Sequence, residues 1–129
     1  MFNVPEDCKD EKVIEIAIKL LKHVISNKKE GGLITYGELS KGLSFPMNPQ
    51  NIEQQLGRIS FACKENGLPP ISVMVVNKDT LMPGIGFYKA YCSEVRGEEA
   101  REKIAIELMN AVRNYVGWND TLEAFENIK

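Results

Sequence analysis

The stretch NIEQQLGRISFACKENGLPPISVMVVN, residues 51–77, decides the fold that this sequence predicts. Its first half repeats polar and apolar side chains with a helical period, which predicts a helix over residues 50–65 with two unlike faces. The polar face is expected to hold Asn51, Gln54, Gln55 and Arg58, and the apolar face Ile52, Leu56, Ile59 and Cys63. The NGLPP segment at residues 66–70 predicts the end of this helix.

The residues before this helix predict a short extended segment and a short helix. Thr35 is suited to cap a helix over residues 36–41, and Glu38 stands at the capping-box position. Two prolines in residues 43–49 disfavour helix, so that segment is expected to be a connection. Asn48 is then placed to cap the helix that follows.

Residues 71–90 predict an antiparallel β-ribbon. The β-branched run at residues 71–77 predicts its first strand, residues 77–80 a turn, and residues 86–90 the return strand. Strand, short helix, longer helix and ribbon, in that order, are typical of a winged helix-turn-helix. The sequence therefore predicts an α+β fold with a winged helix-turn-helix core.

Long helices are expected to flank this core on both sides. Apolar residues recur with a helical period over residues 10–27 and again over residues 97–116. A helical turn capped by Asp120 is expected to close the chain. The chain of 129 residues suits one domain. Within it, residues 10–90 would form the core and residues 97–129 a helical extension.

Composition and charge bound the classes of function. With 43% hydrophobic and 26% charged residues, the composition is that of a globular protein. The sequence has no secretory signal and no apolar run of membrane-spanning length, so we expect a cytoplasmic protein without a membrane partner. A net charge of −2 is not typical of a strong, nonspecific DNA binder.

Catalytic, metal and cofactor sites have no support in the sequence. Three widely spaced cysteines and the single His23 favour neither a disulfide framework nor a zinc site. Cys63 shares the apolar helix face and is expected in the core. Gly84 and Gly86 lack the lysine and hydroxyl residue of a phosphate loop. We therefore expect a protein that is not an enzyme and uses no cofactor.

Four short motifs resemble a known family. ITYGELS at residues 34–40, Gly57, NGLPP at 66–70 and VVN at 75–77 are similar to the C-terminal winged-helix domain of O6-alkylguanine-DNA alkyltransferases and of the catalytically inert alkyltransferase-like proteins. The resemblance spans under half of the chain, from about Ile34 to Gly86. It implies that Tyr36 lies near the backbone of bound DNA.

The chain departs from this family at the reactive centre. Aligning Val75-Val76 with the family's valine pair places Ser72, Val73 and Met74 where that family has its cysteine, histidine and arginine. Alkyl transfer needs a thiolate and a base, and both are missing. Gln54 stands where the family has an arginine that fills the space of a flipped base, and an amide lacks that residue's charge. The resemblance therefore implies a shape and not a reaction.

The polar face of the helix over residues 50–65 is the main candidate for binding nucleic acid. Asn and Gln pair with adenine edges and Arg with guanine in the major groove, so Asn51, Gln54, Gln55 and Arg58 are expected to contact duplex DNA. Lys78 and Lys89, at the turn and far end of the ribbon, would contact phosphates. This mode of DNA binding requires an exposed polar helix face with a β-hairpin beside it. The plain alternative is a solvated helix surface.

A protein-binding module, of the inhibitor or immunity type, is the second hypothesis. The segment MPGIGFY, residues 82–88, is apolar and rich in glycine, and Met and aromatic residues are common in protein interfaces. Met82, Ile85, Phe87 and Tyr88 would then contact a partner, together with the acidic C-terminal helices. DNA, RNA and protein all stay open as partners, and so does the oligomeric state.

Overall fold

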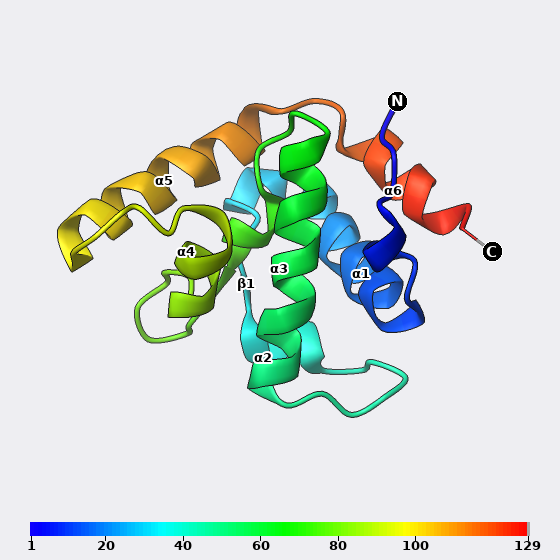
Figure 1. Cartoon of the computed structure of the whole chain (residues 1–129), viewed down its shortest axis with the longest axis horizontal. Coiled ribbons are helices and arrows are strands. Elements are labelled where there is room, and N and C mark those ends of the chain that lie inside the picture. Colours follow the sequence, from blue (N-terminus) through cyan, green and yellow to red (C-terminus); the bar gives the residue numbers. More distant parts are fainter. Residues whose placement is uncertain (129) are drawn as a thin grey trace.

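Helices make up most of the computed structural model, which describes residues 1–128 apart from the side chain of Pro49 (Figure 1). Six α-helices, three 3-10 helices (η) and two short strands follow one another in the described part. In chain order these are η1 Glu6–Cys8, α1 Glu11–Ser26, η2 Lys28–Glu30, β1 Ile34–Thr35, α2 Tyr36–Ser40, α3 Pro49–Glu65, η3 Ile71–Met74, β2 Val75–Val76, α4 Ile85–Tyr91, α5 Glu98–Asn114 and α6 Trp118–Glu126.

The helices before residue 66 form where their local signals predict them. The Asp10 side chain accepts a hydrogen bond from the Lys12 amide at the start of α1. Thr35 and Glu38 form the expected capping box at α2. The Asn48 side chain accepts from the Asn51 amide at the start of α3. Each cap satisfies backbone N–H groups that have no partner within the helix, so the predicted helix starts are confirmed.

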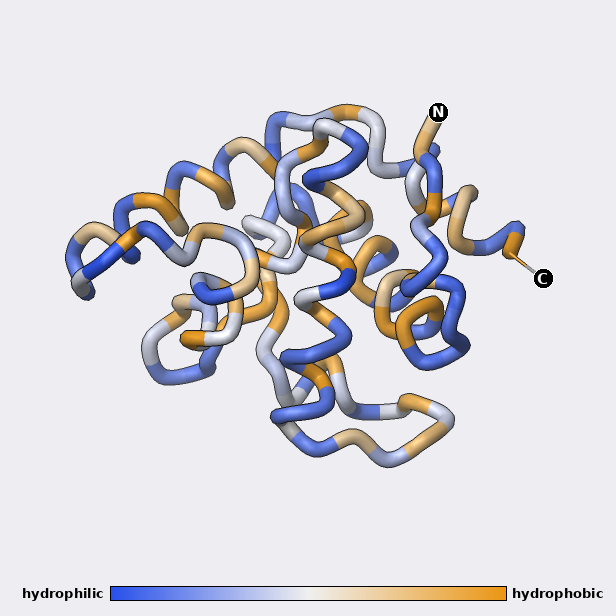
Figure 2. Tube along the Cα trace, in the orientation of Figure 1, coloured by the Kyte–Doolittle hydropathy of each residue, from blue (hydrophilic) through white to orange (hydrophobic). Residues whose placement is uncertain are grey.

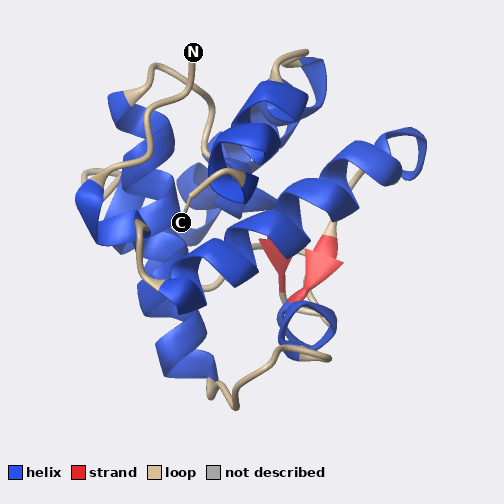
Figure 3. Ribbon diagram, turned by 90° about the vertical axis from the view of Figure 1, so that its right-hand side faces the viewer, coloured by secondary structure: helices blue, strands red, loops and turns tan. Residues whose placement is uncertain are grey.

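The predicted antiparallel ribbon over residues 71–90 is wrong. Residues 71–74 form η3, and only Val75 and Val76 are extended. This β2 strand pairs in parallel with β1, with Ile34 opposite Val75 and Thr35 opposite Val76 (Figure 3). The predicted return strand at residues 86–90 is part of helix α4.

The strand prediction for residues 71–77 is wrong because most of this run is buried on every side. All residues from Ile71 to Val76 are buried, so the run has no polar face and no alternation to distinguish a strand from a buried helical turn. Gly84 then precedes α4 as its N-cap residue. The structure is 63% helix and 3% strand, so the α+β, winged helix-turn-helix class is also wrong.

The C-terminal part agrees with the sequence more closely. The predicted helix over residues 97–116 is confirmed as α5, Glu98–Asn114. The predicted Asp120 cap is wrong, because α6 begins at Trp118 with Gly117 as its N-cap residue, and Asp120 lies inside the first turn. Figure 2 shows apolar positions turned toward the interior, where α1 packs against α6 and α3. Within residues 1–128, no helix combines the length and apolarity needed to cross a membrane.

Candidate nucleic-acid interface on α3

Helix α3 is flanked on both sides by other elements, and one of its faces is uncovered. Figure 1 shows α4 on one side of α3, and α1 and η1 on the other. The apolar face predicted for α3 is confirmed, because Ile52, Leu56, Ile59 and Cys63 are all buried. Gly57 faces α4, and a Cβ added at Gly57 would make an ordinary contact of 3.6 Å with the Cβ of Ala90. This packing holds α3 as a fixed support for its outer side chains.

The outer row of α3 contains some, but not all, of the residues that the sequence assigned to it. Asn51 and Gln54 are exposed. Gln55 is only 8% exposed, so its place on the outer face is wrong. The reason is helical geometry, because Gln55 falls in line with Ile52 and Ile59, which pack into the core. Its Oε1 accepts a hydrogen bond of 3.0 Å from Nη1 of Arg58.

Arg58 lies on the flank of α3 that faces η1. Its side chain is half-buried and its carbonyl oxygen accepts a hydrogen bond of 3.4 Å from the Cys8 thiol. Its side-chain hydrogen bond goes to the neutral amide of Gln55, not to a carboxylate. Arg58 therefore keeps its positive charge beside the exposed amides of α3.

Cations also occur on the opposite flank, where α4 packs. Lys64 of α3 places its ammonium 5.5 Å from the ring centroid of Tyr91 on α4. That ring stacks on Phe87, with centroids 5.8 Å apart and an interplanar angle of 12°. Lys89 is exposed on the outer side of α4. Arg58 thus lies at the edge of the outer face toward η1, and Lys64 lies at the edge toward α4.

Four exposed residues of α3 lie outside the set that the sequence assigned to its polar face: Gln50, Phe61, Lys64 and Glu65. Phe61 is 51% exposed, and Lys64 is exposed as well. Phe61 continues the row of Gln54 and Arg58 at helical spacing, so periodicity could have found it.

Tyr36 is held between α3 and the loop before α4. The capping box at Thr35 begins α2 immediately before Tyr36 and so sets its position. The Tyr36 hydroxyl accepts a hydrogen bond of 2.9 Å from the Gly84 amide and donates one to the Glu53 carboxylate. Burial raises the pKa of Tyr36 above its usual range, and the bond to Glu53 raises it further. Tyr36 therefore remains neutral and acts as a brace.

Glycines at the start of α4 let this segment approach Tyr36 and Glu53 closely. A Cβ added at Gly86 would overlap the Glu53 carboxylate and lie 2.9 Å from its Cδ atom. A Cβ at Gly84 would lie 3.1 Å from the Tyr36 hydroxyl oxygen. The two glycines of the MPGIGFY segment thus serve tight packing on Tyr36 and Glu53.

Ser72, the position aligned with the family's reactive cysteine, is buried beneath this brace. Its hydroxyl is hydrogen-bonded to that of Ser60 on α3. The cavity beside the two serines measures about 10 Å³, which leaves room for about one water. A nucleobase therefore does not fit there. Its lining residues are Tyr36, Glu53, Leu56, Gly57, Ser60, Ser72 and Phe87.

The segment proposed for protein binding divides into exposed and buried residues. Phe87 and Tyr88 are 6% and 5% exposed and belong to the core, so they are not surface contacts. Ile85 is 51% exposed and Met82 is half-buried. Leu81, outside the predicted set, is 53% exposed and has a positive φ of 57°. Lys78 is exposed in the turn after β2 rather than in a wing.

The three cysteine thiols and the His23 imidazole have structural roles. Cys8, Cys63 and Cys92 are free and buried, which confirms Cys63 as a core residue. Burial raises the pKa of the Cys63 thiol to about 11, and burial together with Asp7 raises that of Cys8 to about 12. His23 Nε2 donates a hydrogen bond of 2.8 Å to the Leu33 carbonyl. Among residues 1–128, no three His, Cys, Asp or Glu side chains are grouped as metal ligands.

Comparison with known proteins identifies no relative. No family model matches this sequence, and no curated protein or solved structure matches it either.

Proposed function

We propose that this protein binds duplex DNA through the exposed row of α3, defined here as Asn51, Gln54, Arg58 and Phe61. Exposed amides on a helix are the groups that read adenine edges in a major groove. The helix is backed on both flanks by other elements, so its outer side chains are held in register. The ribbon of the original hypothesis has no part in this proposal.

The observation that supports DNA most directly is the position of the cations. Arg58 lies on the side of η1, Lys64 contacts the Tyr91 ring of α4, and Lys89 is an exposed residue of α4 itself. Phosphates border a groove on two sides, so cations on both flanks of one helix are suitably placed to contact them. The two ion pairs within residues 1–128, Lys9–Glu6 and Lys22–Glu126, leave these three cations unpaired.

Glu53 of α3 is turned away from the exposed row, whereas Glu65 is exposed at the C-terminal end of the same helix. Glu53 accepts the hydroxyl hydrogen bond of Tyr36 and packs against Gly86. Its negative charge is therefore directed at the loop before α4 and not at the outer side of α3. A net charge of −2 for the whole chain is compatible with a locally basic surface.

Salt dependence of DNA binding tests this proposal. Three phosphate contacts predict a slope of about −3 in a plot of log affinity against log salt concentration. The pair Lys64→Gln, Lys89→Gln should reduce that slope by about 2, because two contacts are lost. The exposed pair Asn51→Ala, Gln54→Ala should weaken binding with an unchanged slope. Fluorescence anisotropy with a short labelled duplex measures both quantities.

A pair of lysines elsewhere provides the matched control. Lys29→Gln with Lys103→Gln makes the same charge change on η2 and α5, where both residues are exposed. We expect this control pair to bind DNA like the unmodified protein. An equal loss of slope in the control pair would show that net charge, and not the α3 surface, governs binding. DNA binding that does not depend on salt would contradict the proposal.

A protein partner is the second candidate, favoured by a different surface. Leu81 and Ile85 are both about half exposed next to a pocket of about 500 Å³ between the loop before α4 and the start of α5. Glu98 and Glu102 form its acidic side. The matching partner is a protein segment with apolar and basic side chains. Its affinity would fall less with salt than that of a phosphate-binding surface.

A further inference from the structure

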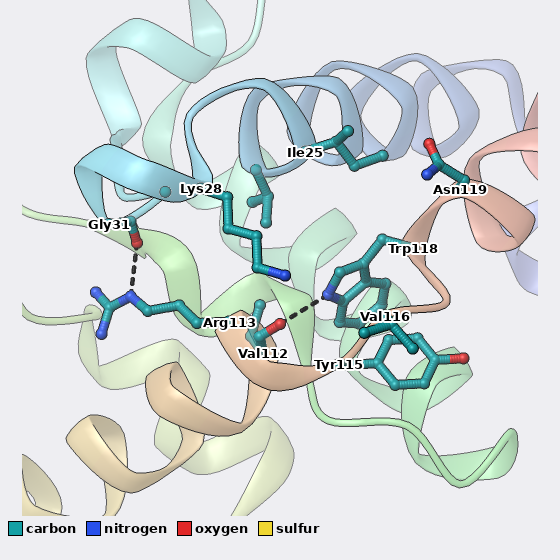
Figure 4. A pocket seen from close by; sticks show the side chains of 11 residues that line it. Ile25, Lys28, Gly31, Val112, Arg113, Tyr115, Val116, Trp118 and Asn119 are labelled. Carbon is teal, nitrogen blue, oxygen red and sulfur yellow. Dashed lines mark hydrogen bonds between the residues drawn. The ribbon is translucent and has the colours of Figure 1, made fainter.

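A second pocket lies where α1, α5 and α6 meet (Figure 4). Its volume is about 260 Å³, which corresponds to about nine waters at ~30 Å³ each. None of its described lining residues belongs to α3. The site is therefore separate from the proposed DNA surface, and it is large enough for a ligand of about ten heavy atoms.

The walls of this pocket are apolar and held in place. They are formed by Val24, Ile25, Val112, Tyr115, Val116 and Trp118. The Trp118 indole donates a hydrogen bond of 2.9 Å from Nε1 to the Val112 carbonyl. The Tyr115 ring meets it edge to face, with centroids 4.8 Å apart. With its polar atom satisfied and its edge supported, the indole presents an apolar surface to the pocket.

Val116 extends this apolar surface to the pocket rim. It is 86% exposed, the highest exposure in residues 2–128 among the large apolar side chains. Single exposed apolar residues are common on protein surfaces. At the edge of an open apolar pocket, however, a ligand that enters would also cover Val116.

Two cations border the pocket and have no acidic counterpart in it. Figure 4 shows the Lys28 side chain reaching from η2 toward Trp118. Arg113 donates from Nε to the Gly31 carbonyl at 2.7 Å and from Nη1 to Asn110 at 3.1 Å. Among the described residues that line the pocket, none is an aspartate or glutamate. Lys28 also takes part in neither of the two ion pairs found within residues 1–128.

We propose that this pocket binds a small monocarboxylate with an apolar body. The carboxylate would accept a charge-assisted hydrogen bond from the Lys28 ammonium, and Arg113 would add to the positive potential. The apolar body would pack on Trp118 and cover Val116. Lys28 is exposed, so a carboxylate would exchange the water around its ammonium for a charge-assisted hydrogen bond, which an uncharged ligand does not offer.

Trp118 allows a direct test, because it is the only tryptophan in the chain. Titration with 3-phenylpropionate should change the tryptophan fluorescence in a saturable way, with a dissociation constant on the order of 1 mM for so small a probe. The neutral 3-phenylpropanamide has the same shape without the charge. We expect it to bind about tenfold more weakly, because it cannot pair with the ammonium.

Two neighbouring lysines give a matched pair of variants. Lys28→Gln should weaken 3-phenylpropionate binding by about tenfold, whereas Lys29→Gln, exposed on the same turn but outside the pocket, should leave it unchanged. Equal binding of acid and amide, or unchanged binding by Lys28→Gln, would overturn the assignment of an anionic ligand. A fluorescence signal that does not saturate up to about 20 mM would overturn the site itself.

Discussion

Single atoms decide the geometry around Tyr36. Its hydroxyl joins the Gly84 amide to the Glu53 carboxylate, and so connects α2, α3 and the loop before α4. The absence of a side chain at Gly86 leaves the space that this carboxylate occupies. Adding a methyl group at Gly86 is therefore expected to disturb α2, α3 and the start of α4 together.

We predict that Gly86→Ala lowers the free energy of unfolding by about 1 kcal/mol, because the new Cβ displaces the Glu53 carboxylate and weakens its hydrogen bond with Tyr36. Urea denaturation would measure the change. Gly57→Ala is the control, since its Cβ would meet Ala90 at an ordinary 3.6 Å. Alanine is also the better helix former by about 1 kcal/mol. The Gly86→Ala effect should shrink in a Glu53→Ala background. An undiminished effect there would show that the overlap with Glu53 is not the cause.

At the scale of elements, short helices depend on their ends. Helix α2 spans only Tyr36–Ser40, so its own backbone hydrogen bonds are few and its capping box has a large share in its stability. The Glu38 carboxylate accepts hydrogen bonds from the backbone N–H and the hydroxyl of Thr35. These bonds lower the pKa of Glu38 below its usual value.

Thr35→Ala should destabilise the protein by about 1 kcal/mol, since the Glu38 amide loses its acceptor. Thr35→Ser keeps the hydroxyl and should have a much smaller effect in the same denaturation experiment. The alanine variant should also return the pKa of Glu38 toward its usual value, which an NMR titration measures. Because this pKa is lowered in the folded state, the stabilisation is present above the unfolded-state pKa and is lost as the pH falls through the folded-state pKa. Equal effects of Ala and Ser would exclude the cap.

At the scale of the whole molecule, the two ends of the chain pack together. The Phe2 and Phe125 rings lie with centroids 5.6 Å apart, and Asn3 exchanges hydrogen bonds with Asn66 beyond the end of α3. The N-terminal segment thus joins α6 to α3 (Figure 1). This arrangement leaves the exposed row of α3 and the carboxylate pocket on separate parts of the surface.

Phe125→Ala should lower the free energy of unfolding by about 3–5 kcal/mol, because it opens a cavity at a ring that is 1% exposed. Phe61→Ala makes the same chemical change at a ring that is 51% exposed. It should cost about 0.5 kcal/mol, although it removes a side chain from the proposed DNA surface. Thermal and urea denaturation of the two variants test this contrast. Similar losses in both would mean that Phe61 is packed in solution.

The sequence by itself determined the starts and lengths of most helices. The caps at Asp10, Thr35 and Asn48 were predictable because each acts within a few residues of itself. The apolar face of α3 was predictable for the same reason, because helical periodicity is a local property. Asn51 and Gln54 were found in this way as exposed residues of the candidate site.

Only the tertiary structure decided how the segment from Ile71 to Tyr88 folds. Val75 pairs with Ile34 from a distant part of the chain, and Gln55, Phe87 and Tyr88 are buried because other elements cover them. A continuous apolar run has no period from which to read its conformation, so its neighbours choose between strand and helical turn. The carboxylate pocket likewise forms where residues of η2, α5 and α6 meet, and such a meeting of distant residues leaves no local pattern in the sequence.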